Sequence, residues 1–219
     1  MRVRNPIVII AIAWMSFALT AHATVQSLPF TDHFAYSEGD LFSVASGVWG
    51  AGGGAGPEFT VSTNAALTSP SGFAASLGKG VLWQPSSTAR RNLVQFSFVA
   101  SGEVYASFLI SIQTAPSSGS RCFAYLENTT SSTTSPQLGI FVDGTSSIGV
   151  GKKATVPAVT SSPLSAGTHL VVVRYTFLSG NDQGDLWVDP SSSDYGATNA
   201  SVSGIVTNNA GVAKGPFAP

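Results

Sequence analysis

The chain has 219 residues, a length that suits one domain with a sizeable hydrophobic core. Charged residues make up only 10% of it, and 10 basic side chains stand against 11 acidic ones, for a net charge of −1. A protein that binds nucleic acid needs a basic surface to neutralise phosphates, so we expect no nucleic-acid partner.

The first 23 residues have the three parts of a secretory signal peptide. Arg2 and Arg4 give a positive start, residues 7–21 are almost wholly apolar, and Ala21-His22-Ala23 places small residues where signal peptidase needs them. The apolar stretch of about 15 residues is shorter than the roughly 20 that span a membrane, so we expect cleavage after Ala23 rather than a retained anchor. The mature chain, residues 24–219, would then be secreted, periplasmic or at the cell surface, without a membrane span.

Downstream of the signal, short segments alternate apolar and polar residues as half-buried strands do, and no convincing helical period occurs. Two weaker strands come first, at residues 58–62 and 81–84. Residues 94–98 and 104–113 alternate strongly, and Ser101-Gly102 between them predicts a tight hairpin.

The second half of the chain continues the pattern. Weaker strands are expected at residues 121–126, 138–142 and 147–151. A strong strand follows at 170–177, and a polar turn joins it to 185–188, which predicts a second hairpin. Many short strands separated by Gly, Pro and Ser predict one all-β domain, a two-sheet antiparallel sandwich or jelly roll.

Few side chains could react or hold a transition metal. Cys122 is the only cysteine, so no disulfide forms within the chain, and its apolar neighbours favour a buried small side chain over a reactive thiol. His33 and His169 lie far apart, and no G-x-S-x-G elbow accompanies them. We therefore expect buried or edge-strand histidines rather than a catalytic triad or a zinc site.

Three stretches resemble a group of secreted bacterial laminin G-like domains. Residues 30–36, Phe30-Thr31-Asp32-His33-Phe34-Ala35-Tyr36, are followed by Gly39, Leu41 and Gly47-Val48-Trp49, and this order is similar to the family's opening pattern D-x-F-x-Y, G-x-L and G-W. Residues 102–109 match a second stretch, and residues 170–175 with Leu186-Trp187-Val188-Asp189-Pro190 match a third.

The resemblance implies a concanavalin A-like fold: a two-sheet antiparallel jelly-roll sandwich over residues 24–219, preceded by the signal-peptide helix of residues 1–23. Such domains usually end with a strand that pairs beside the first one. Here the chain stops at residues 214–219 without one. We expect either a truncated reading frame or an open sheet edge that another chain covers, through which the protein would self-associate.

The implied fold hosts both binding modules and glycoside hydrolases, so it does not decide whether the chain is an enzyme. Hydrolases of this fold carry an E-x-D-x-x-E run, and the nearest approach is Glu38-Gly39-Asp40, which has no third acid and is typical of a turn. The glycine-rich residues 50–56 indicate a loop rather than a phosphate-binding site, since no helix pattern follows. We name no catalytic residue.

Two binding sites are suggested by residue type. Asn181, Asp182 and Asp185 crowd oxygen atoms into one predicted turn, which suits Ca²⁺, and laminin G-like domains often carry this ion; turn formation by the same residues is the alternative. Trp49 and Trp83 flank loops, where an exposed ring could stack on a sugar, although core packing is the commoner use.

We expect a secreted, non-catalytic module that binds a polysaccharide or a cell-envelope glycan. A divergent glycoside hydrolase of the concanavalin A-like fold is the first alternative. A structural or adhesive surface protein is the second.

Overall fold

The computed structural model describes residues 24–52, 59–72, 75–83, 91–97, 99, 101–126, 138–151, 157, 159–179, 182–191 and 202–205. Within them the chain is mostly strands, with one short helix, α1 (Leu41–Val44), and one 3-10 turn, η1 (Thr63–Ala65). The all-β prediction is confirmed. The expected signal peptide, residues 1–23, and the C-terminal residues 206–219 lie outside the described residues. No helix in the described part is long and apolar enough to cross a membrane.

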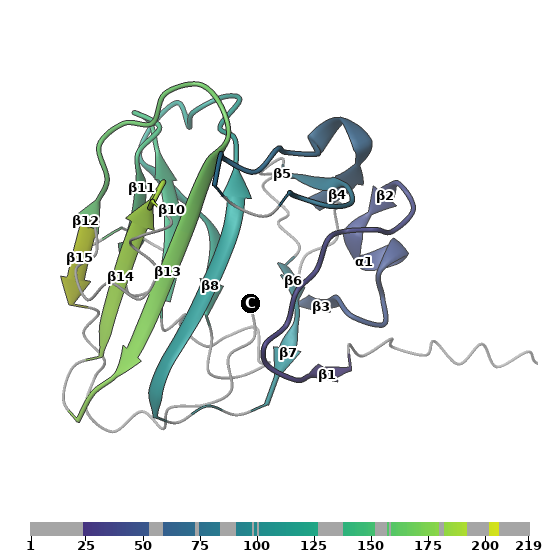
Figure 1. Ribbon diagram of the computed structural model, residues 1–219, viewed down its shortest axis with the longest axis horizontal. Coiled ribbons are helices and arrows are strands. Elements are labelled where there is room, and N and C mark those ends of the chain that lie inside the picture. The colour runs from purple at the N-terminus through teal and green to yellow at the C-terminus, as the bar shows by residue number, and fades with distance from the viewer. Residues whose placement is uncertain are drawn as a thin grey trace, which may run out of the picture.

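Two four-stranded antiparallel sheets form the larger part of the fold (Figure 1). The first has the order β15-β14-β13-β8 and consists of β8 (Gly102–Ile110), β13 (His169–Phe177), β14 (Gln183–Val188) and β15 (Val202–Ile205). The second has the order β12-β11-β10-β9 and consists of β9 (Ser120–Leu126), β10 (Leu138–Asp143), β11 (Ile148–Gly151) and β12 (Val159–Thr160).

The main hydrophobic core lies between these two sheets. Alternate residues of β13 enter it, as the sequence pattern predicts: Val171, Val173 and Tyr175 are fully buried. Facing them are the buried side chains of the second sheet, namely Leu126, Leu138, Ile140, Val142, Ile148 and Val150. This shared core makes the two sheets a sandwich-like unit.

Three small sheets from the first hundred residues lie beside β8 (Figure 1). One contains β2 (Gly39–Asp40), β4 (Phe59–Ser62) and β5 (Gly80–Trp83); another pairs β3 (Gly50–Gly52) with β6 (Arg91–Leu93); the third pairs β1 (Val25–Gln26) in parallel with β7 (Gln95–Phe96). Leu41, Ala45 and Val61 form a second, smaller core there.

A row of aromatic rings connects the smaller core with the main one. The Phe59 ring, which packs against the smaller core, stacks on Trp83 with 6.5 Å between centroids. Trp83 lies 6.1 Å from Phe123, and Phe123 meets Phe108 edge to face at 5.7 Å. Offset or edge-to-face rings at these separations attract each other beyond the area they bury.

Each segment that the alternation marks as a strand overlaps an observed strand, and the β13–β14 hairpin is confirmed. The other predicted hairpin is wrong. β7 pairs with β1, while β8 pairs with β13 along nine residues, because β13 offers it a partner of matching length and a matching apolar face. Residues 50–52, expected in a loop, form β3. The five sheets do not join into one closed jelly roll within the described strands.

Leu186→Ala tests the position of the main core. Leu186 is fully buried between the sheets, so we expect the free energy of unfolding in urea to fall by about 2–5 kcal/mol. The matched control is Leu82→Ala, at an exposed position, where the change should stay within about 0.5 kcal/mol. Similar losses at the two positions would contradict this core.

Candidate functional site

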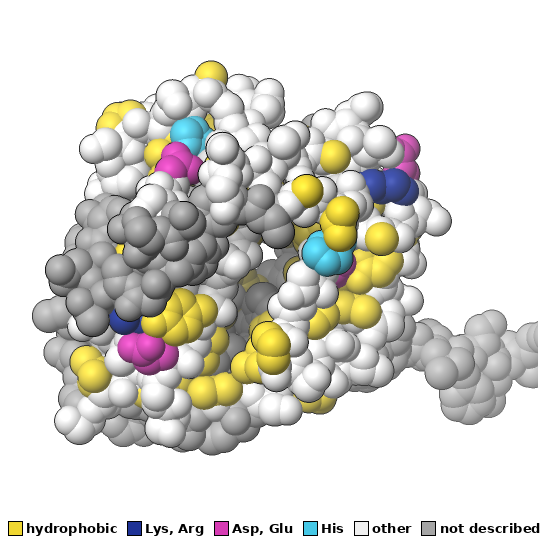
Figure 2. All heavy atoms as spheres, in the orientation of Figure 1, with side chains coloured by type: hydrophobic (Ala, Val, Ile, Leu, Met, Phe, Trp, Pro, Cys, Tyr) yellow, Lys and Arg dark blue, Asp and Glu magenta, His cyan; other side chains and the backbone are white. Residues whose placement is uncertain are grey.

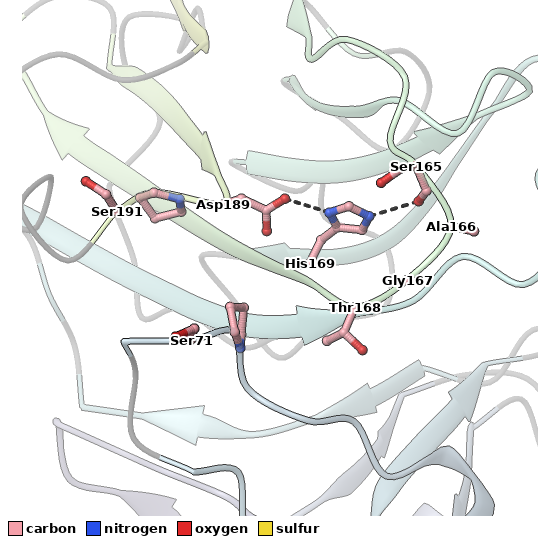
Figure 3. A pocket seen from close by; sticks show the side chains of 10 residues that line it. Ser71, Ser165, Ala166, Gly167, Thr168, His169, Asp189 and Ser191 are labelled. Atoms are coloured by element: carbon pink, nitrogen blue, oxygen red, sulfur yellow. Dashed lines mark hydrogen bonds and ion pairs between the residues drawn. The ribbon is translucent and has the colours of Figure 1, made fainter.

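A pocket of about 390 Å³ opens where β13 begins and β14 ends (Figure 3). Three segments that lie far apart in the sequence form its walls: the loop after η1, the turn that leads into β13, and the residues that follow β14. Its polar side chains are Ser71, Ser165, Thr168, His169, Asp189 and Ser191, and two proline rings, Pro70 and Pro190, add apolar surface. The volume falls in the range of small-molecule sites.

His169 and Asp189 form a clamp on the pocket wall (Figure 3). His169 Nδ1 lies 2.6 Å from Asp189 Oδ2, and His169 Nε2 lies 2.9 Å from the carbonyl oxygen of Ser165. The Leu170 N–H donates to Asp189 Oδ1 at 2.9 Å, and the Asp189 N–H donates to the Leu170 carbonyl at 2.8 Å. The clamp therefore ties the start of β13 to the end of β14.

The surroundings of His169 favour its protonated form. Burial alone would lower the pKa of this imidazole, but the hydrogen bonds to Asp189 and to the Ser165 carbonyl, with the negative charge of Asp189, raise the pKa above its ordinary value. A protonated ring donates from both nitrogens, which matches the two oxygen acceptors present.

This arrangement does not suit a serine nucleophile. A Ser-His-Asp triad needs an unprotonated Nε2 that accepts the serine proton, with Nδ1 held by the carboxylate. In His169 the Nε2 position faces the Ser165 carbonyl instead, although Ser71 and Ser191 line the same pocket. His169 therefore positions Asp189 rather than acting as a base.

Asp189 presents its carboxylate to the pocket. Its backbone has φ of 49°, a left-handed conformation that Asp tolerates better than most residues. The side chain is 46% exposed, against 9% for His169, and each carboxylate oxygen is held by one donor from the protein. Because a carboxylate oxygen accepts about two hydrogen bonds, each keeps capacity for a ligand donor.

The two tryptophans proposed as sugar platforms lie elsewhere, and both are partly buried. Trp49 donates from Nε1 to Asp32 Oδ2 at 2.6 Å, stacks on Phe34 at 5.8 Å and packs against the smaller core. Trp83 belongs to the aromatic row and packs against the main core. The structure favours the packing alternative for both, and neither lines the pocket.

Two of the three proposed calcium ligands, Asp182 and Asp185, bind different protein donors. Asp182 accepts from the Tyr175 hydroxyl at 2.6 Å and from the Leu178 N–H at 2.9 Å. Asp185, on the other side of the sheet, forms an ion pair with Arg174 at 2.7 Å. Asn181 lies outside the described residues. Among the described side chains no group of three or more His, Cys, Asp or Glu could hold a metal ion.

Two predictions about reactive residues need correction, and one is confirmed. His169 is buried as expected. His33 is exposed and lies outside any strand, because the neighbouring Asp32 and Phe34 turn towards Trp49 and leave it on the outside. Cys122 is only half-buried, with its Sγ 3.2 Å from the Ala124 carbonyl oxygen.

Sequence reasoning did not select Asp189 as a site residue. A signal for it exists in the predicted hairpin of residues 170–177 and 185–188. The observed pairing of Val171 with Val188 puts Leu170 opposite Asp189, so a histidine just before one strand lies near an aspartate just after the other. The contribution of Ser71 depends on a distant loop and has no such signal.

The clamp should make stability depend on pH. The pKa of His169 is higher in the folded chain than in the unfolded chain, where it is about 6.5. Protonation of His169 therefore stabilises the folded state fully at a pH below about 6.5, and this stabilisation is lost as the pH rises through the folded-state pKa. We expect the Tm to fall as the pH rises above about 6.5 and through the raised pKa of His169, and we expect His169→Gln to flatten that fall. The control His33→Gln should keep the wild-type slope, and an unchanged slope in His169→Gln would refute the clamp.

The hairpin should not respond to calcium. The Asp182 and Asp185 carboxylates already bind protein donors on opposite sides of the sheet, so a cation would have to break those contacts. We expect thermal unfolding to give the same Tm in excess calcium and in chelator. A Tm that rises with calcium would restore the proposed site at Asn181, Asp182 and Asp185.

Comparison of the chain with protein-family models, with curated proteins and with solved structures gives no match. The geometry of the chain itself therefore has to support any functional assignment.

Proposed function

We propose that this protein is an extracellular, non-catalytic module that binds carbohydrate in the His169–Asp189 pocket. One observation carries the proposal: the Asp189 carboxylate is held by hydrogen bonds to His169 and to the Leu170 N–H, and the Asp189 side chain is still 46% exposed in a pocket large enough for a small ligand. A fixed acceptor of this kind suits adjacent hydroxyl groups of a sugar, because its two oxygens can receive two hydrogen bonds side by side.

The rest of the pocket has matching chemistry. The hydroxyls of Ser71 and Thr168 can both donate to and accept from a sugar. Pro70 and Pro190 supply apolar surface for the C–H groups of a sugar ring. Binding sites commonly combine apolar walls with a few fixed polar groups, and this pocket has both.

Binding without hydrolysis agrees with the charges at the site. Glycosidases that use two carboxyl groups hold them about 5–5.5 Å or 6.5–9.5 Å apart, depending on mechanism. Asp189 is the one acidic side chain among the residues that line the pocket, and its hydrogen bonds favour the charged form of His169 rather than a general base.

The extracellular part of the proposal rests on sequence. Ala21-His22-Ala23 and the preceding apolar segment support export, and the laminin G-like resemblance supports a concanavalin A-like jelly roll. The sandwich of two antiparallel sheets agrees with that family at the level of architecture.

The test measures binding of methyl glycosides of neutral hexoses by calorimetry. Thr168→Val and Ser71→Ala change side chains that form none of the clamp's hydrogen bonds, and each should weaken binding by about two- to tenfold. Asp189→Asn should weaken it more than tenfold, because it removes a charged acceptor. Thr160→Val, an exposed threonine outside the pocket, is the matched control and should bind as the wild type does.

Other outcomes would contradict the proposal. Release of reducing ends from a polysaccharide, lost in Asp189→Asn, would identify a divergent glycoside hydrolase instead. Failure of every neutral hexoside to bind would leave the structural or adhesive alternative.

A further inference from the structure

The turn that leads into β13 forms one wall of the pocket and has few contacts of its own. It supplies four of the ten residues that line the pocket, residues 165–168. Ser165, Ala166 and Gly167 are exposed, Thr168 is half-buried, and none of them belongs to a strand. A Cβ added at Gly167 would meet no described atom within 4 Å. Packing therefore does little to fix the position of this wall.

One hydrogen bond holds the 165–168 turn in place. Just before the turn, the Leu164 N–H donates to the Ser146 carbonyl at 3.2 Å, and the Leu164 side chain packs against the main core. Within the turn, the Ser165 carbonyl oxygen lies 2.9 Å from His169 Nε2 (Figure 3). Among the described residues, the turn makes no other hydrogen bond. We call the contact between His169 Nε2 and the Ser165 carbonyl the latch.

The latch needs a proton on both nitrogens of the His169 ring. The two atoms that face these nitrogens, Asp189 Oδ2 and the Ser165 carbonyl oxygen, can only accept hydrogen bonds. A protonated ring donates to both, whereas a neutral ring has a single N–H. A hydrogen bond to a charged acceptor is roughly twice as strong as one to a neutral acceptor, so the neutral ring keeps its proton on Nδ1, towards Asp189. Its Nε2 lone pair then faces the Ser165 oxygen and repels it.

The charges around His169 leave its own protonation in control of the latch. Asp189, just after β14, is the one charged group among the described residues that acts on the ring. The other described elements around the ring present uncharged residues, namely Ile110 of β8, Pro70 and Ser71 of the loop after η1, and residues 165–168. Figure 2 shows a histidine and an acidic side chain side by side at this end of the large sheets, with no described basic side chain next to them.

We propose that the pocket binds its ligand in a pH-dependent way: protonated His169 holds the 165–168 turn against the ligand, and loss of the Nε2 proton to water releases the turn and weakens binding. This proposal rests on the proposed function of the pocket. Once the turn is released, the Thr168 hydroxyl is no longer held in position. A group that is not held in advance loses more conformational entropy when it binds a ligand.

Deprotonation has a second effect, which opposes the first. Without the positive ring beside it, the Asp189 carboxylate becomes a stronger hydrogen-bond acceptor for a ligand. The Asp189 side chain is 46% exposed, however, so water screens most of this change in charge. Asp189 also keeps both of its protein donors, Nδ1 of His169 and the Leu170 N–H, so its position is unchanged. Release of the turn therefore dominates, and the affinity falls as the pH rises.

Calorimetry with a methyl hexoside tests the proposal, since this ligand carries no titratable group of its own in the pH range used. The series starts at about pH 5.5, one unit below the unfolded pKa of histidine, where the ring is protonated. We expect the Kd to rise by about two- to tenfold with pH, at the midpoint at which the His169 ring titrates in NMR. His169→Gln should bind with the same Kd throughout, and the control His33→Gln should keep the wild-type dependence.

Two pocket variants that leave His169 intact make the test independent of how His169→Gln folds. Thr168→Val removes a hydroxyl that the turn carries, so it should weaken binding at low pH and flatten the pH dependence. The matched variant Ser71→Ala removes a hydroxyl on the opposite loop. It should weaken binding by the same factor at every pH.

NMR of the protein without ligand tests the latch separately. As the pH rises, the His169 ring should lose its proton from Nε2 and keep the one on Nδ1. The carbonyl carbon of Ser165 should shift with the same midpoint, and the amides of residues 166–168 should show lower order parameters at high pH.

Each contrary result has a separate meaning. If the Ser165 carbonyl does not respond when His169 titrates, or if the Kd stays constant or falls as the pH rises, the pH dependence is overturned and hexoside binding in the pocket stands. If no methyl hexoside binds at low pH although the turn is held, the proposed function fails and its pH dependence fails with it.

Discussion

β13 pairs with β14 on one side and with β8 on the other. This double pairing sets the positions of the polar side chains at the pocket and on the outer face of the sheet. Its odd-numbered residues from Val171 onward fill the core, so Arg174 must lie on the outer face. At the start of β13, the same register brings His169 to Asp189. Packing of one apolar strand face thus determines where the polar groups can meet.

The three acidic residues of the β13–β14 hairpin each hold a different part of it. Asp182 receives the buried Tyr175 hydroxyl near the turn, Asp185 holds Arg174 on the outer face, and Asp189 holds His169 at the open end. A carboxylate that already binds fixed donors is a poor metal ligand but a well-oriented acceptor. Of the three, Asp189 is the one whose carboxylate is also exposed to solvent and so can accept hydrogen bonds from a ligand.

The strands could be located from sequence because burial of one strand face places apolar residues at every second position, as in β10 and β13. Two features had no local signal. The parallel pair of β1 and β7 joins residues about seventy positions apart. Trp49 could not be distinguished from an exposed ring, because its partner Asp32 lies 17 residues earlier in the chain. In the candidate site, His169 and Asp189 were readable from hairpin register, whereas Ser71 was not.

The aromatic row that connects the two cores affects how the protein unfolds. Phe59 and Trp83 lie between the small core and Phe123 of the large one, so the small sheets cannot separate without exposing rings of the main sandwich. The hydrophobic cost of that exposure links the two cores. Heating should therefore melt the described sheets together in a single cooperative transition rather than in two steps.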